Sequence, residues 1–295
     1  MNRIWRKAAV LITVGLLALP LCAQGLRIIA FGAHPDDCDF RAGGAGAKFA
    51  AHGDHVKFVT LTDGSAGHQT QGGGALSNRR RAETQESARR LGIEAYEMLD
   101  NHDGELLPTL EARREVIRKI REWKADVVLA PRPWDYHPDH RYTGVLVQDA
   151  AYMVMVPNIC PETPSLRKNP VFLYFEDGFQ RPNPFRPDVA ISIDDVFDKK
   201  VAAIASHVSQ MFEWWPFMTD RLAEVPADPV ARVAWLRKLR FEDPLPATIR
   251  EGLRKWYGPQ ADVIRHAEAF EVCEYGRQPT LQELRKLFPF FPQKK

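Results

Sequence analysis

The sequence predicts an α/β protein with a mostly parallel, Rossmann-like sheet covered by helices on both faces, plus a helical, Trp-rich C-terminal insertion. Short apolar runs typical of buried strands alternate with longer helical runs over residues 27–151. Motifs rich in histidine and aspartate follow two of these strands. With 295 residues, of which 45% are hydrophobic and 26% charged, the chain can bury the core of one large domain. Disordered and fibrous classes are therefore excluded.

The N-terminus is typical of a secretory signal peptide. Three basic residues, Arg3, Arg6 and Lys7, precede an apolar run over residues 8–21, and a small residue for cleavage follows. We expect residues 1–24 to be removed and the protein to be exported, periplasmic or extracellular, with no stable membrane span afterwards. An uncleaved anchor is the alternative, although the apolar run is shorter than the roughly 20 residues that cross a bilayer.

Charge and cysteine content limit the classes of partner. Cleavage would change the formal net charge from +2 to −1, because it removes three positive charges and no acidic residue. A near-neutral chain lacks the basic surface that binds nucleic acid, so we expect a small-molecule or glycan substrate; the sequence does not predict the oligomeric state. The remaining cysteines, Cys38, Cys160 and Cys273, are too few for a disulfide framework, although one disulfide is possible.

The first half of the chain contains two strands and two helices of the predicted sheet. Ser77 can cap the second helix, and Gly92 can end it. A Gly-rich loop over residues 63–74 precedes that helix. In chain order, the elements are a strand at Arg27–Gly32, a helix at about Gly43–His52, a strand at His55–Thr62 and a helix at Ser77–Leu91.

The pattern continues to about Tyr152 and then loosens into a Pro-rich connection. We draw one domain over residues 25–275, with residues 211–259 as a helical insertion or cap and residues 276–295 as a loose tail. The further elements are strands at Ala95–Leu99, Asp126–Ala130, Val171–Phe175 and Val189–Ile193, helices at Leu110–Trp123 and Phe197–Ser206, and a helical remainder with Trp214, Trp215, Trp235 and Trp256.

Two short motifs carry metal-binding chemistry. The run Ala33-His34-Pro35-Asp36-Asp37 follows the first strand, and His137-Pro138-Asp139-His140 follows the strand that ends at Ala130. The carboxyl ends of parallel strands meet at one edge of an open sheet, so the two motifs can converge there. Imidazoles and carboxylates can hold one divalent metal, leave a position open for water and still provide a base. The first interpretation is a mononuclear metallohydrolase.

Both motifs, AHPDD and HPDH, resemble those of the LmbE-like N-acetylglucosaminyl deacetylases, the PIG-L superfamily. The resemblance extends over about residues 26–272 and includes the two motifs in register. Further stretches agree with the family in order and spacing: Thr62-Asp63-Gly64, Arg80-Arg81-Ala82-Glu83, Leu91-Gly92, Ser206-His207-Val208-Ser209-Gln210 and Ala267-Glu268-Ala269-Phe270.

The resemblance implies a ligand set and a base. His34, Asp37 and His140 are expected to hold one Zn²⁺ per chain, with Fe²⁺ as the alternative metal. Three protein ligands leave a fourth position for water, as catalytic zinc sites require. Asp36 is expected to act as the general base on that water, whose pKa zinc lowers towards about 7. The competing interpretation of Asp36 is a helix N-cap.

The reaction implied by the resemblance is hydrolysis of an N-acetyl group. Zinc and a protonated His137 would stabilise the oxyanion, and Asp36 would return the proton to the departing amine. Asp139 is expected to contact a metal-bound or catalytic imidazole and orient it.

Three residues are candidates for contact with the sugar. Arg81 is the chosen arginine of the Arg79–Arg81 run, although Arg80 is equally well placed by sequence. Asp103 matches a position that contacts sugar hydroxyls, but an Asp-Gly turn would also favour it. Tyr136 can lean over the substrate or pack against its own loop.

The chain departs from the family pattern at two positions close to the first motif. Asp39 stands where glutamate is common, and Arg41 stands where a small apolar residue is common. Two alternatives to the deacetylase remain: a metallohydrolase of the same fold that cleaves another amide or an ester, and a non-catalytic carbohydrate-binding protein. Asp36 and His137 are both present, which favours an enzyme.

Overall fold

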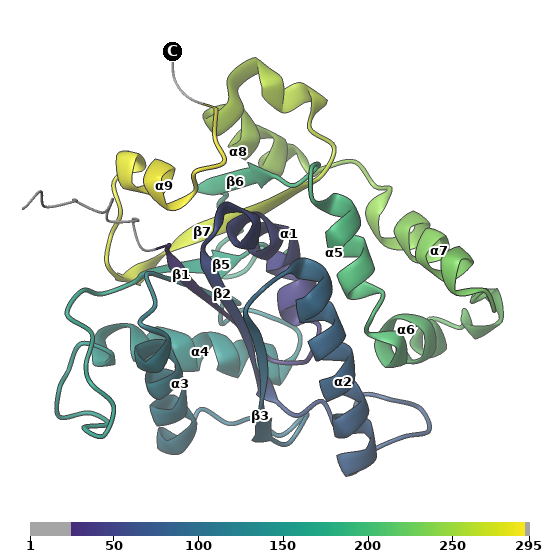
Figure 1. Ribbon diagram of the computed structural model, residues 1–295, viewed down its shortest axis with the longest axis horizontal. Coiled ribbons are helices and arrows are strands. Elements are labelled where there is room, and N and C mark those ends of the chain that lie inside the picture. Colours follow the sequence, from purple (N-terminus) through teal and green to yellow (C-terminus); the bar gives the residue numbers. More distant parts are fainter. Residues whose placement is uncertain (1–24, 293–295) are drawn as a thin grey trace, which may run out of the picture.

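The computed structural model describes residues 25–292, so the expected signal peptide lies outside the described residues. One seven-stranded sheet runs through this part of the protein, in the order β3-β2-β1-β4-β5-β7-β6 (Figure 1). No helix within residues 25–292 is both long and apolar enough to cross a membrane. The strands are β1 Arg27–Gly32, β2 His55–Thr62, β3 Ala95–Asn101, β4 Val127–Ala130, β5 Val171–Phe175, β6 Val189–Ser192 and β7 Ala267–Gly276.

Five neighbouring strands of the sheet are parallel, which confirms the predicted Rossmann-like fold. Ala30 of β1 pairs with Phe58 of β2 on one side and with Leu129 of β4 on the other. The central part of these strands is buried because helices cover both faces of the sheet. The chain leaves β1 towards β2 and β3, then returns to β4 and β5 on the opposite side. The order of strands therefore reverses between β1 and β4.

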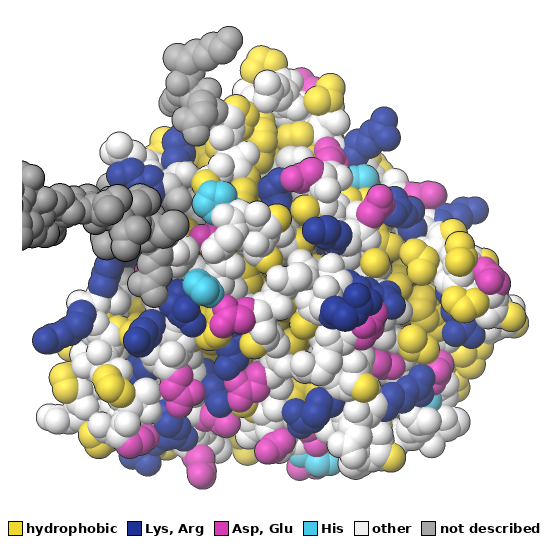
Figure 2. All heavy atoms as spheres, viewed as in Figure 1, with side chains coloured by type: hydrophobic (Ala, Val, Ile, Leu, Met, Phe, Trp, Pro, Cys, Tyr) yellow, Lys and Arg dark blue, Asp and Glu magenta, His cyan; other side chains and the backbone are white. Residues whose placement is uncertain are grey.

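Helices cover both faces of the sheet, as predicted. The helices α1 (Asp37–His52), α2 (Gly73–Leu91) and α5 (Phe197–Ile204) pack together on one face, and α3 (Leu110–Trp123) and α4 (Pro138–Met153) pack together on the other (Figure 1). The visible surface mixes acidic and basic side chains without a large patch of one sign (Figure 2). This agrees with the low net charge of the sequence.

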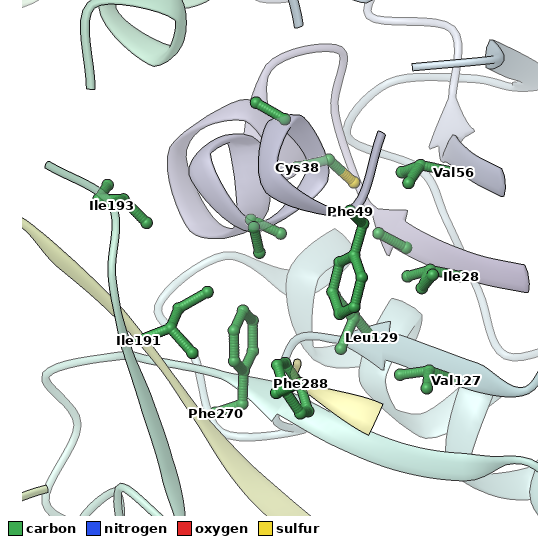
Figure 3. Close-up of a cluster of buried hydrophobic side chains, with 14 of the residues drawn as sticks. Ile28, Cys38, Phe49, Val56, Val127, Leu129, Ile191, Ile193, Phe270 and Phe288 are labelled. Carbon is green, nitrogen blue, oxygen red and sulfur yellow. The ribbon is translucent and has the colours of Figure 1, made fainter. Parts of the chain in front are cut away.

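The core beneath α1 holds the start of that helix in place. Phe49 of α1 contacts Phe288, with ring centres 5.5 Å apart, and Phe270 of β7 lies next to them (Figure 3). A side chain in place of Gly44 would lie 2.7 Å from Ile193, so the small residues of α1 permit its close packing. The same helix begins at the first metal motif, and its packing therefore fixes the position of that motif.

Strand β7 is the largest element that the sequence analysis missed. It lies antiparallel between β5 and β6, whereas the sequence predicted only helix in this region. Three acidic residues, Glu268, Glu271 and Glu274, recur at a spacing of three and so suit a helix. Glu268 is in fact buried, where it binds Lys200 Nζ at 2.6 Å. The strand was not predicted because the sequence does not show that Glu268 is buried in an ion pair.

The proposed insertion, residues 211–259, does not form one cap. The π-helix η1 (Gln210–Trp214), α6 (Trp215–Met218) and α7 (Pro229–Phe241) lie beyond α5 (Figure 1). In contrast, α8 (Ala247–Tyr257) packs against β6, where Leu253 and Ala190 belong to one buried cluster. The second part of the expected insertion is thus a layer of the main domain.

The prediction of a loose tail after Gly276 was wrong. Helix α9 (Leu281–Leu287) begins with a capping box between Thr280 and Glu283. Phe291 stacks on Trp256 at a ring-centre distance of 4.2 Å, and Leu284 and Phe288 are buried. The segment therefore closes one side of the core.

Several helix boundaries also differ from the prediction. Helix α1 begins six residues earlier than expected, at Asp37, and α2 begins at Gly73. Ser77 consequently lies inside α2 and does not cap it, whereas Gly92 ends α2 with a φ of 78°, as predicted. Cys38, Cys160 and Cys273 are all buried and free of disulfide bonds.

Candidate metal centre and active site

The two metal motifs meet where the order of the strands reverses. The first motif follows β1 directly, and the second lies between β4 and α4. These strands are neighbours, and open α/β sheets bind ligands outside the carboxyl ends of such strands. A side chain in place of Gly32 would lie 2.8 Å from Cβ of Asp37, so the turn after β1 can be this tight only with glycine there. At the other motif, Pro138 starts α4 and His137 is its N-cap.

His34, Asp37 and His140 bring one donor atom each to a common point. His34 Nδ1 lies 3.1 Å from His140 Nε2 and 3.7 Å from Asp37 Oδ2, and the remaining edge of the triangle, His140 Nε2 to Asp37 Oδ2, is 3.4 Å. Ligand atoms of a tetrahedral site with bonds of 2.0–2.1 Å are about 3.3 Å apart. The three donors therefore fit one divalent metal without rearrangement.

Carboxylates bind the opposite nitrogen of both imidazoles. Nε2 of His34 lies 3.1 Å from Asp103 and 3.2 Å from Asp139, and Nδ1 of His140 lies 3.0 Å from Asp135. A carboxylate accepts the N–H, so this nitrogen carries the proton and the other keeps its lone pair. Nδ1 of His34 and Nε2 of His140 are thus the nitrogens free to bind a metal.

The electric field of this cluster favours a cation. Burial lowers the pKa of His34, but Asp103, Asp139 and Asp37 together outweigh burial and raise it well above the usual value. Burial also lowers the pKa of His140, but Asp37 and Asp135 outweigh burial and raise this pKa to about 9. A divalent metal would satisfy the same field in place of protons. The charges as well as the distances therefore suit a metal.

Other donors surround the triangle without replacing it. His137, His34 and His140 can bring their nitrogens within 4.8 Å of one another. However, Nδ1 of His137 accepts a hydrogen bond from the Asp139 amide at 3.2 Å, which leaves Nε2 as its free position. Asp103 and Asp139 also form a group with His34, but on the nitrogen that faces away from Asp37. His137 is hence a neighbour of the metal position, and these two carboxylates support it.

Asp36 lies next to the triangle and does not cap α1. Its side chain makes no capping hydrogen bond, and its Oδ1 lies 3.6 Å from a terminal nitrogen of Arg80. Burial raises the pKa of Asp36, and the charge of Arg80 opposes this rise. A carboxylate with a raised pKa is suited to exchanging a proton near neutral pH.

The structure places Arg80, not Arg81, at the site. Arg80 is 2% exposed and donates to the carbonyl oxygens of Pro35, at 3.0 Å, and Gly64, at 3.4 Å. Arg81 points to a different part of the protein, where its guanidinium lies 3.6 Å from the carboxylate of the exposed Asp100. Successive residues of a helix differ by about 100° in direction, so only one of the two can face the site. The choice of Arg81 as a substrate contact is therefore corrected.

Asp103 is also placed differently from the expectation. Only 7% of it is exposed, one of its oxygens binds His34, and the other accepts hydrogen bonds from the amides of Ala66 and Gly67 at 3.1 and 3.2 Å. Both of its carboxylate oxygens are thus occupied, one by a histidine and one by the Gly-rich loop. Tyr136, which is 75% exposed, lies at the rim with its ring centre 5.7 Å from that of His140.

The Gly-rich loop is fastened to η1. Gln210 donates to the carbonyl oxygen of Gly67 at 3.0 Å, and Nε2 of His68 binds Glu213 at 2.8 Å. Arg79 of α2 donates to the same glutamate. π-Helical turns such as η1 are frequent at functional sites. The loop thus holds Asp103 on one side and η1 on the other.

A buried polar group supports the first turn of α1 from behind. Asp39 accepts a hydrogen bond from Tyr96 at 2.8 Å and lies 3.2 Å from His207, and none of its surface is exposed. Asp39, which departs from the family pattern, is thus a buried acceptor inside the protein. His207 is 0% exposed and lies against Asp39, so it is a buried partner of the first turn of α1.

Sequence reasoning missed Asp135 and the choice between the arginines. Asp135 stands two residues before His137, and its position in an irregular loop gave no periodic signal. A carboxylate within a few residues of a candidate histidine ligand was the signal available for it.

Comparisons with known proteins find similar sequences and similar structures. The family model described as PIG-L, GlcNAc-PI de-N-acetylase, matches residues 29–151. The chain is 34% identical over 203 residues to a diacetylchitobiose deacetylase of Thermococcus kodakarensis, a match that covers 65% of this chain and 74% of the relative. The structure of an N,N'-diacetylchitobiose deacetylase from Pyrococcus horikoshii superposes with a TM-score of 0.62 and 25% identity, and covers 83% of both chains.

A further similar structure has a different activity. GalB of Pseudomonas putida KT2440, a 4-carboxy-2-hydroxymuconate hydratase, superposes with a TM-score of 0.61 at 22% identity, covering 87% of this chain and all of that one. This similarity concerns the fold alone.

Proposed function

Because this chain belongs to the PIG-L family, we propose that it hydrolyses the N-acetyl group of an amino sugar or of its glycoconjugate, releasing acetate and a free amine. The chain is an enzyme, a hydrolase that acts on amides. One observation carries the proposal: three donors converge in a triangle suited to a metal, and an unused carboxylate, Asp36, lies beside it.

We propose that the metal is Zn²⁺, held by His34, Asp37 and His140. Two nitrogens and one carboxylate oxygen, with room for water, are the donors that catalytic zinc sites use, although Fe²⁺ suits the same set. When bound, the metal would lower the pKa of water and polarise the carbonyl group of the acetyl. The supporting carboxylates keep both imidazoles in the tautomer that this requires.

Asp36 is proposed to move the proton. It accepts a proton from the attacking water and later delivers it to the nitrogen of the leaving amine. The guanidinium of Arg80, which is itself held by Pro35 O and Gly64 O, stabilises the carboxylate form. Burial and Arg80 thus act in opposite directions on the same group, which suits a base that must also serve as an acid.

His137 is proposed to stabilise the oxyanion as a neutral side chain. Burial lowers the pKa of His137, and the charges of His34 and His140 lower it further, which supports a neutral side chain in place of the protonated one that the resemblance implies. The Asp139 amide occupies Nδ1, which leaves the proton on Nε2. That N–H can donate to the oxygen on which negative charge develops.

Two other functions remain open to experiment. The related fold of a hydratase shows that this architecture alone does not determine the reaction. A metallohydrolase of another amide or an ester would keep the same triangle and base. A carbohydrate-binding protein would bind N-acetylated sugars and release no acetate.

The test is acetate release by the purified, zinc-loaded protein from a panel of N-acetylated sugars that includes N,N'-diacetylchitobiose. We expect turnover, and we expect Asp36→Asn to lower kcat by about 10²–10⁴-fold, the usual contribution of a general base. Thermal unfolding should show that the variant still folds cooperatively, with a Tm lowered only by the loss of the charge opposite Arg80, since Asp36 makes no capping bond. Acetate release that survives the substitution would disprove the mechanism, and binding without release would favour a carbohydrate-binding protein.

We also propose that the protein is exported. The proposal is supported by the basic and apolar pattern of residues 1–24 alone. Expression of the full chain in its source cells, followed by fractionation and N-terminal sequencing, should recover a chain that begins near residue 24 outside the cytoplasm. A chain that retains Met1 and sediments with membranes would indicate the uncleaved anchor.

A further inference from the structure

Two arginines beside the site have no role in the chemistry described above. Arg240 of α7 lies over two aromatic rings, with its guanidinium carbon 5.2 Å from the ring centre of Phe40 and 4.9 Å from that of Trp215. Phe40 is in the first turn of α1, and its amide donates to the carbonyl oxygen of Asp36 at 3.1 Å. The rings thus hold the Arg240 guanidinium next to the catalytic turn.

Arg41 approaches the same place from α1. It follows Asp37 by four residues, so the two side chains share one face of the helix and start about 6 Å apart along its axis. Helical side chains lean towards the N-terminus, which in α1 is the metal motif. Both Arg41 and Arg240 are exposed. Within residues 25–292, neither has a hydrogen bond or a carboxylate within 4.0 Å.

The effect of Arg41 on the pKa of Arg240 agrees with a position of both arginines at the same edge of the site. Burial lowers the pKa of Arg240, and the charge of Arg41 lowers it further. The charge of Asp36 acts in the opposite direction, so Arg41 and Asp36 both lie close enough to affect Arg240. Arg41 also acts on Glu176, whose pKa burial raises. Arg240 lies over the ring of Phe40, the residue before Arg41, so the two positive charges are at the same edge of the site. Among the described residues, no carboxylate forms an ion pair with either arginine.

We infer that Arg41 and Arg240 bind an anionic substituent, a phosphate or a carboxylate, on the N-acetylated sugar. Two positive charges without paired anions repel each other, and a ligand anion between them removes the repulsion. Guanidinium groups bind the oxygens of phosphate and carboxylate in pairs, which gives direction as well as strength. The inference rests on the proposed function, because the acetyl group must lie at the metal position for the substituent to reach the arginines.

The distance along α1 agrees with such a substrate. About one helical turn separates Asp37 from Arg41, a length comparable with one sugar ring. Arg240 comes from α7, far outside the family match at residues 29–151. Arg41 is the residue that departs from the family pattern. The two arginines would thus give this chain a preference that the metal motifs alone do not determine.

The test compares neutral and anionic substrates of one sugar. The rate constant kcat/KM for acetate release is measured with N-acetylglucosamine, N-acetylglucosamine 6-phosphate and N-acetylmuramic acid, which carries a carboxylate. We expect the anionic sugars to be preferred by at least about tenfold, mostly through KM, with a preference that falls as salt is added. The phosphate and carboxylate arms identify which anion is bound.

Variants separate specific binding from general charge. Arg41→Gln combined with Arg240→Gln should reduce kcat/KM for the anionic sugars to the value for the neutral sugar and leave the neutral sugar unaffected. Lys238→Gln removes one charge from an exposed position of the same helix, and it should retain the preference. Equal rates with neutral and anionic sugars, or a preference that survives in the double variant, would overturn the inference.

A failure of the proposed function can be recognised separately. If no sugar releases acetate, calorimetric binding of the same three sugars to the full protein gives an independent answer. Tighter binding of an anionic sugar that is lost in the double variant would uphold the anion site and refute the deacetylase. Equal binding of all three sugars would refute the anion site as well.

Discussion

The metal triangle depends on which nitrogen of each histidine carries a proton. Asp103 and Asp139 bind the outer nitrogen of His34, while Asp135 alone binds that of His140. A carboxylate on the outer nitrogen fixes the ring and its tautomer, and it also makes the inner nitrogen more basic. His140 has one such partner and His34 has two. Asp135 is therefore the position at which a single substitution removes all of this support from one ligand.

We expect Asp135→Ala to weaken metal affinity by about 10–100-fold. Affinity is measured by competition with a chromophoric chelator at fixed pH. Asp100→Ala is the matched control, since its carboxylate is 97% exposed and lies against Arg81. Equal affinities of the two variants would show that Asp135 does not support His140.

Single residues also show how far the sequence could predict the site. The donors of the triangle and Asp36 lie in contiguous motifs, so their residue types and order were sufficient to find them. The choice between Arg80 and Arg81 was not predictable in this way, because it depends on how α2 is rotated about its axis. That rotation is set by which side chains the helix buries, and Arg80 is buried in spite of its charge.

At the level of elements, the packing of α4 against the loop after β4 positions His140. A side chain in place of Gly144 would lie 2.8–2.9 Å from backbone atoms of Pro131, Arg132 and Pro133. Backbone cannot yield as a flexible side chain can. Because His140 is one turn before Gly144, any displacement of the helix would also move this ligand.

We expect Gly144→Ala to lower the free energy of unfolding by about 1–3 kcal/mol and to weaken metal binding. Gly74→Ala, in α2, is the control, since no atom lies within 4 Å of its added side chain. That change should be neutral or stabilise the protein by up to about 1 kcal/mol. Urea denaturation of both variants makes the comparison, and equal stabilities would contradict the packing argument.

The contact between the Gly-rich loop and η1 has a defined pH dependence. A hydrogen bond from Arg79 lowers the pKa of Glu213, and His68 contributes in the same direction. A carboxylate whose pKa is lower in the folded state stabilises the fold above its unfolded pKa, near 4.5. This stabilisation is lost as the pH falls from there through the lower pKa of the folded state.

Glu213→Gln should therefore reduce stability by up to about 1 kcal/mol at pH 7, a limited effect because the side chain is one-third exposed. The difference from the unchanged protein should shrink as the pH is lowered below about 4.5, and thermal unfolding at several pH values measures it. Glu224→Gln is the control, since that glutamate is 52% exposed and its single ion pair, with Arg221, is long at 3.7 Å. A difference that is constant from pH 7 to pH 3.5 would refute the role of Glu213.

The elements that were predicted correctly share a simple pattern. The parallel strands β1, β2 and β5 are short segments rich in apolar and β-branched residues, and polar or turn residues follow them, so their limits follow from the sequence. Strand β7 and helix α9 were missed because their role depends on partners far away in the chain. Glu268 of β7 is buried because it pairs with Lys200. Phe288 and Phe291, which follow α9, pack against Phe49 and Trp256.

For the whole molecule, a metal at the triangle should stabilise the fold. The donors come from two distant segments, and a ligand that binds only the folded state adds its binding free energy to stability. Removal of the metal by a chelator should lower Tm by several degrees, because a free ligand at 100 times its Kd contributes about 2.7 kcal/mol. Addition of Zn²⁺ should restore Tm. His140→Ala should show no such response, and a full response in that variant would place the metal elsewhere.

The position of β7 also determines the order in which the sheet can be completed. Strand β6 pairs only with β7 among the described residues, and about 75 residues of chain separate them. Strands β1 to β5 can associate as soon as residue 175 is available, but β6 has no neighbour until residue 276 has been made. A chain shortened before residue 267 would therefore leave β6 without a partner and expose the edge of β5. Such an edge can pair with a second chain, so premature termination should give aggregates and not a smaller folded enzyme.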